Sequence, residues 1–163
     1  MNIDRKVDFA LEIIKKFLLL KYVVITELGS FNNVLLVVRS PNKKIHSQIR
    51  LITSGKKIQK SKLFGKVYEW TLHGIDEDRK DYDLFYCFIC FDKDLGKNRR
   101  FIVPKNVVGK YLKEEHKYWV TYGKTHKEND WRAFRLGFKG ESYSKLIPPP
   151  MADEYEERWD LFK

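Results

Sequence analysis

A predicted β-hairpin between residues 35 and 54 constrains the fold more than any other stretch of this chain. Its two apolar runs, Leu35–Val38 and Ile49–Ile52, are rich in leucine and β-branched residues, as strands at the buried centre of a sheet require. The polar residues 40–42 (Ser-Pro-Asn) form the connection between them. We therefore expect a sheet with this hairpin at its centre.

Charge is distributed unevenly around this hairpin. No aspartate or glutamate occurs between Leu28 and Tyr68, whereas nine lysines and arginines lie there, in a chain of net charge +10. A concentrated basic surface predicts an anionic partner, and nucleic acid is the leading candidate. The alternative is a solvated basic face that only aids solubility. The residues expected to contact nucleic acid are Lys43, Lys44, Arg50, Lys56, Lys57, Lys60 and Lys62.

The rest of the sequence predicts helices and further strands around the hairpin. Apolar residues at helical spacing predict a first helix from Ile3 to about Lys21, and Pro104 begins a second helix. Residues 54–65 carry four lysines and predict an exposed loop. We expect one α/β domain over residues 1–147, followed by a proline-led acidic segment, residues 148–163, that packs on it. Further strands are predicted at residues 22–27, 66–72, 83–91, 99–103 and 131–136.

Two features of the sequence bear on location and redox chemistry. No apolar run is long enough to cross a bilayer and no secretory signal precedes the first helix, so we expect a cytoplasmic protein without a membrane partner. Cys87 and Cys90 lie in a continuous apolar strand, where residues three apart point to opposite faces. We therefore expect two buried small hydrophobic residues rather than a metal site or a disulfide.

Three aromatic residues lie next to the basic segment. Phe64, Tyr68 and Trp70 are close enough in sequence to stack on unpaired bases. Their strand pattern favours a position in the core for Tyr68 and Trp70, and it leaves Phe64 undecided. His116 lies at the margin of the apolar stripe of the second helix, and we expect it to be structural.

Several short motifs follow one another in a familiar order. Leu18–Tyr22 (LLLKY) precedes a strand, a later strand ends at Ile102–Pro104 (IVP) before two valines, and residues 126–129 read His-Lys-Glu-Asn. In the order of these motifs, the chain resembles small bacterial proteins of the PD-(D/E)XK nuclease superfamily, also called restriction-endonuclease-like. The resemblance extends from the first helix to residues 159–161. It implies a three-layer α/β/α core, with a mixed central sheet flanked by helices.

The catalytic residues of that superfamily do not carry over. Active members place an aspartate on the first hairpin strand and a Glu/Gln-x-Lys triplet on the second, and the carboxylates hold a magnesium ion that activates a water. Here the aspartate position falls on Asn33 or Val34, and the triplet becomes Gln48–Arg50 or Arg50–Ile52. The resemblance thus implies a degenerate active site. Its expected remnants are Glu12, Asn33, Gln48 and Arg50.

Three functions stay open at this point. The first is a DNA- or RNA-binding protein that has lost catalysis and needs no cofactor. The second is a magnesium-dependent nuclease whose carboxylate has moved to Glu12, Glu27 or Glu69. The third is an interaction module, or a homodimer, in which the acidic C-terminal segment covers the basic face of a second copy.

Overall fold

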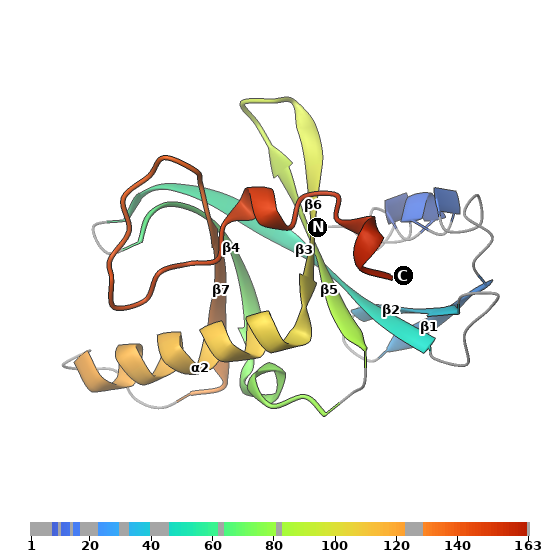
Figure 1. Ribbon diagram of the computed structural model, residues 1–163, viewed down its shortest axis with the longest axis horizontal. Coiled ribbons are helices and arrows are strands. Elements are labelled where there is room, and N and C mark those ends of the chain that lie inside the picture. Colours follow the sequence, from blue (N-terminus) through green and yellow to red (C-terminus); the bar gives the residue numbers. More distant parts are fainter. Residues whose placement is uncertain are drawn as a thin grey trace.

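The computed structural model describes residues 8–9, 11–13, 15–16, 23–29, 33–39, 46–61, 64–80, 83–122 and 129–162. It is a mixed α/β protein built on a seven-stranded sheet (Figure 1). The α/β class predicted from the sequence is therefore confirmed. The strands are β1 (Val23–Gly29), β2 (Asn33–Arg39), β3 (His46–Ser61), β4 (Gly65–His73), β5 (Leu84–Asp92), β6 (Lys97–Pro104) and β7 (Trp131–Gly137).

The predicted hairpin is present, and its second strand joins two parts of the sheet. The first half of β3 pairs antiparallel with β2 and parallel with β5, which in turn pairs with β6. From Lys56 onward, β3 pairs with β4, and β4 pairs with β7. Figure 1 shows β3 crossing the molecule between these two parts.

The prediction of a loop at residues 54–65 is wrong, because β3 continues to Ser61. Gly55, where β3 changes partners, lets the Trp70 indole lie against the backbone: a Cβ there would fall 2.0 Å from Trp70 Nε1. Beyond this glycine, Lys56 and Lys57 pair with carboxylates that come from later segments of the chain. Lysine content alone therefore gave a misleading loop prediction, because the compensating acids are distant in sequence.

The two faces of the sheet carry separate hydrophobic clusters. Phe9 and Ile13, from the helical N-terminal residues, pack with Cys87 on one face. Cys90 belongs to the cluster on the other face, together with Tyr68 and Trp70. The predictions that the two cysteines are buried on opposite faces, and that Tyr68 and Trp70 belong to the core, are confirmed.

Helix α2 (Lys105–Tyr122) covers the second face. The helix is present as predicted but begins one residue later, because Pro104 is the last residue of β6. Its buried stripe includes Val108, Tyr111, Leu112 and Glu115, and it packs against β7 and the 3₁₀ turn η2 (Gly74–Glu77). Among the described residues, no helix is long and apolar enough to cross a membrane.

The C-terminal segment, residues 138–162, runs back along the sheet. The Gly137 N–H donates to the Pro150 carbonyl at 2.8 Å, and the Ile102 N–H donates to the Tyr155 carbonyl, also at 2.8 Å. This second contact covers the free edge of β6, which otherwise exposes unpaired backbone groups. The segment contains two short 3₁₀ turns, η3 (Ala152–Glu154) and η4 (Trp159–Phe162).

Candidate nucleic-acid interface

The centre of the hairpin holds a buried ion pair. Arg50 on β3 is 8% exposed and donates from Nη1 to the Asp76 carboxylate of η2. Tyr86 donates its hydroxyl to the same carboxylate oxygen at 2.7 Å, and the His73 N–H donates to the other oxygen at 3.2 Å. Burial, followed by the negative charge of Asp76, raises the pKa of Tyr86. Asp76 thus accepts three hydrogen bonds, and its charge is compensated by Arg50, with the Arg79 guanidinium 3.9 Å away.

Asp76 is a carboxylate near the hairpin centre that the sequence did not reveal. It lies 26 positions after Arg50, in a stretch that reads only as a charged loop. No local pattern links the two residues, because η2 reaches Arg50 only after β4 has returned along the sheet. The nearest available signal was that a basic, acid-free sheet centre must obtain its counter-charges from elsewhere.

Those predicted remnants of a catalytic site whose side chains are described do not come together as one group. Glu12 pairs with Arg100 on β6, on the face of the sheet opposite to Arg50. Gln48 lies half-buried on β3, and its N–H donates to the Asp83 carbonyl at 2.9 Å. The side chain of Asn33 lies outside the described residues.

The two other proposed carboxylates, Glu27 and Glu69, also give no metal site in the described residues. Glu69 accepts a hydrogen bond from Arg135 at 2.8 Å and pairs with Lys56 at 3.4 Å, and the side chain of Glu27 lies outside the described residues. Within the described part of the chain, no three His, Cys, Asp or Glu side chains are arranged to hold a metal ion.

Two of the lysines predicted to bind nucleic acid also form ion pairs. Lys56 pairs with Glu69, although its side chain is 69% exposed. Lys57 is 13% exposed and lies between Asp92 and Asp94, at 3.5 Å and 2.5 Å. The hydrogen bond to Asp94 raises the pKa of Lys57. The other predicted lysine side chains fall outside the described residues: Lys43, Lys44, Lys60 and Lys62.

Asp92 belongs to a second buried polar cluster. Tyr68 donates its hydroxyl to Asp92, and Arg99 donates to the Tyr68 oxygen at 2.8 Å. Burial by itself would raise the pKa of Asp92, but the hydrogen bond from Tyr68 and the charge of Lys57 lower it. These contacts stabilise the ionised carboxylate inside the protein.

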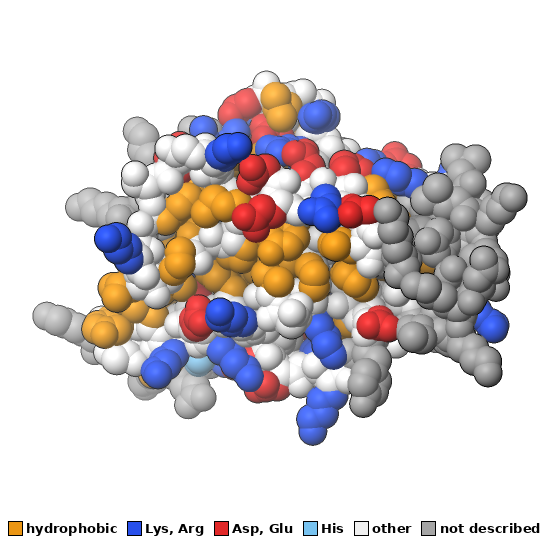
Figure 2. Space-filling view, in the orientation of Figure 1, with side chains coloured by type: hydrophobic (Ala, Val, Ile, Leu, Met, Phe, Trp, Pro, Cys, Tyr) orange, Lys and Arg blue, Asp and Glu red, His pale blue; other side chains and the backbone are white. Residues whose placement is uncertain are grey.

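An exposed basic stripe on α2 was not anticipated from the sequence. Lys110, Lys113 and Lys117 follow one another at helical spacing on the side opposite to the buried residues. Basic side chains lie along the lower edge of the molecule, over α2, in Figure 2. Lys113 pairs with Asp78, whereas Lys110 and Lys117 form no ion pair with any other described residue. The spacing of these lysines was the signal in the sequence.

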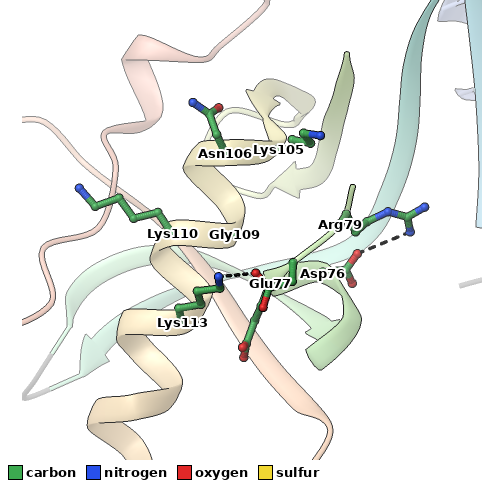
Figure 3. Close-up of a pocket in the computed structure, with 9 residues that line it drawn as sticks. Asp76, Glu77, Arg79, Lys105, Asn106, Gly109, Lys110 and Lys113 are labelled. Carbon is green, nitrogen blue, oxygen red and sulfur yellow. Dashed lines mark hydrogen bonds and ion pairs between the residues drawn. The ribbon is translucent and has the colours of Figure 1, made fainter. Parts of the chain in front are cut away.

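A pocket of about 450 Å³ lies between η2 and the first half of α2 (Figure 3). Gly109 allows this close packing, because a Cβ at that position would lie 2.6 Å from the Glu77 carbonyl oxygen. Lys113 points toward η2 in Figure 3, and Lys110 extends to the other side of the helix. Each of the three acids in the lining pairs with a cation: Asp76 with Arg50, Glu77 with Arg132 and Asp78 with Lys113.

A second pocket, of about 220 Å³, lies between the second half of α2 and β7. Trp119 of α2 and Trp131 of β7 both line it, so we call it the tryptophan pocket. Trp131 is 62% exposed, and its ring lies 5.0 Å from that of His73. The Arg132–Glu77 ion pair joins the linings of the two pockets.

Comparison with known proteins identifies no relative. No family model, curated protein or solved structure matches the chain. The chain is therefore described by its fold and its sites: a mixed α/β protein with an ion pair at the hairpin centre, a lysine stripe on α2 and a tryptophan-lined pocket between α2 and β7.

Proposed function

We propose that this protein binds nucleic acid without cleaving it, on a restriction-endonuclease-like core. The observation that carries the proposal is the lysine stripe of α2, formed by Lys110, Lys113 and Lys117. Two of its lysines have no carboxylate partner among the described residues, in a chain of net charge +10. Such a stripe attracts phosphates irrespective of sequence and releases counterions when they bind.

The ion pair at the hairpin centre supports the absence of cleavage. A divalent metal requires carboxylate oxygens that are free to coordinate it. Asp76 instead accepts hydrogen bonds from Arg50, Tyr86 and the backbone of His73. Releasing it for a metal would leave the Arg50 guanidinium buried without a counter-charge, at a cost of several kcal/mol.

The arrangement of the core supports the family resemblance. The β2–β3 hairpin lies inside a mixed sheet, with β5 parallel to β3. The helical N-terminal residues contribute to the cluster on one face and α2 to the cluster on the other. This order of layers is what a three-layer nuclease-like core would have.

A binding experiment with matched charge variants tests the proposal. Lys110→Glu/Lys117→Glu should weaken binding to labelled DNA or RNA strongly in 50 mM salt. Lys93→Glu/Lys97→Glu changes the net charge equally at the exposed β5–β6 turn, and it should weaken binding much less. For the unmodified protein, the logarithm of the association constant should fall linearly with the logarithm of the salt concentration. Equal losses in the two variants would refute the α2 face, and absence of binding at low salt would refute the function.

A further inference from the structure

The most exposed tryptophan of the described chain lines the tryptophan pocket. Trp131 is 62% exposed at the start of β7, although a tryptophan buries a large apolar area when it packs in a core. It pairs across the sheet with His73, and the two rings lie 5.0 Å apart and 35° from parallel. An indole held at one side and open at the other presents a flat face to a ligand.

Trp119 provides an indole on the facing element. It is half-buried on α2 and lies 6.1 Å from the His116 ring, close to parallel with it. Both tryptophans line the 220 Å³ pocket, one from the helix and the other from the strand. This volume is smaller than the roughly 300–1,000 Å³ of pockets for drug-sized ligands. The pocket therefore suits a single planar group.

The charged groups around the pocket are paired with one another. Arg132 pairs with Glu77, and Arg135 pairs with Glu115, which also lines the pocket. The lining thus suits an uncharged planar group.

His116 also lines the pocket, and Lys113 precedes His116 by one turn of α2. Lys110 and Trp119 are nine residues apart, about two and a half turns of α2, so their side chains leave the helix on opposite sides. Lys113 lies on the same side as His116, about 4.5 Å from it along the helix axis. A strand that passes over His116 can thus contact Lys113 and the pocket together.

We infer that the tryptophan pocket takes an unpaired nucleobase, and that the preferred ligand is single-stranded nucleic acid with a neighbouring phosphate at Lys113 of the α2 lysine stripe. This inference rests on the proposed function and adds the substrate class. Aromatic stacking on bases is tolerant of sequence, because every base has a π-face, and the electrostatic contact is equally tolerant. In a duplex the bases are stacked on one another and are unavailable to the pocket.

Fluorescence anisotropy with four ligands that carry the same fluorescent label tests the inference. The ligands are oligo(dT), oligo(rU) and an abasic DNA strand, each about 15 nucleotides long, and a DNA duplex of the same length. Trp131→Ala should weaken binding to the single strands about tenfold, with an unchanged salt slope. Trp131→Phe should retain most of the affinity. Phe91→Ala, which removes an aromatic ring of 55% exposure from the β5–β6 hairpin, should bind like the unmodified protein. Comparing oligo(dT) with oligo(rU) distinguishes DNA from RNA as the source of the base.

The abasic strand separates stacking from charge. It carries phosphates but no bases, so Trp131→Ala and the unmodified protein should bind it equally, as they should the duplex. Circular dichroism melting checks that each variant is folded. Equal binding of oligo(dT) and oligo(rU) by Trp131→Ala and the unmodified protein would overturn the inference while leaving the proposed function intact. An equal loss with the abasic strand would overturn it too, and absence of binding to all four ligands would refute the proposed function itself.

Discussion

Arg50 and Asp76 form a buried ion pair at the centre of the sheet, where the family resemblance would place a nuclease active site. The carboxylate comes from a turn after β4 rather than from the hairpin itself. Its partner is an arginine, whose planar guanidinium forms directed hydrogen bonds and keeps its charge when buried. The charges of Arg50 and Asp76 at the centre of this sheet therefore cancel.

Removing one partner of this pair should destabilise the fold strongly. Asp76→Ala leaves Arg50 buried without its counter-charge and removes an acceptor of Tyr86, so we expect the free energy of unfolding to fall by about 3–5 kcal/mol. The double variant Arg50→Met/Asp76→Ala should lose less, because the buried charge of Arg50 is removed with its partner, and Arg79, the other cation near Asp76, is 25% exposed to solvent. Urea denaturation at pH 7 measures both. If the double variant loses as much unfolding free energy as the two single variants together, Arg50 and Asp76 do not compensate each other's charge.

The two cysteines should be unreactive in the native protein. Burial raises the pKa of the Cys90 thiol to about 12, and it also raises the pKa of Cys87. Because the thiolate is the reactive form, a disulfide reagent at pH 8 should label neither residue until denaturant is added, when both should react. Rapid labelling of the native protein would contradict the buried, opposite-facing arrangement.

Local patterns were sufficient to predict most strands and α2, because apolar alternation and helical spacing report the burial of each element. They were insufficient where the structure depends on distant partners. Lys56 and Lys57 lie in a strand that pairs with β4, and their acids come from β4 and the β5–β6 turn. Likewise, the tryptophan pocket exists only because β7 brings Trp131 next to α2, and no spacing in the sequence encodes that proximity.

Acid should weaken the fold through Asp92. Its pKa is lowered in the folded state, so the unfolded chain binds its proton first as the pH falls below about 4. The stabilisation is therefore complete at neutral pH and is lost as the pH falls through the lowered folded-state pKa. Tyr68→Phe removes a hydrogen bond that lowers this pKa, so its unfolding free energy should depend less steeply on pH between 4 and 2. Denaturation at a series of pH values measures how the unfolding free energy of each protein depends on pH. An equal dependence in Tyr68→Phe and the unmodified protein would show that Tyr68 does not lower the pKa of Asp92.

Gly109→Ala should reverse the usual effect of removing a glycine from a helix. In an exposed helix this change stabilises by about 0.8–1 kcal/mol. Here the new Cβ would lie 2.6 Å from the Glu77 carbonyl oxygen, so η2 and α2 must separate. We expect a net loss of about 1–3 kcal/mol, as in overpacked cores, measured by thermal and urea denaturation. Asn106→Ala, at an exposed position of the same helix, is the control and should change stability little. Greater stability of Gly109→Ala would show that η2 is not packed against α2 at this point.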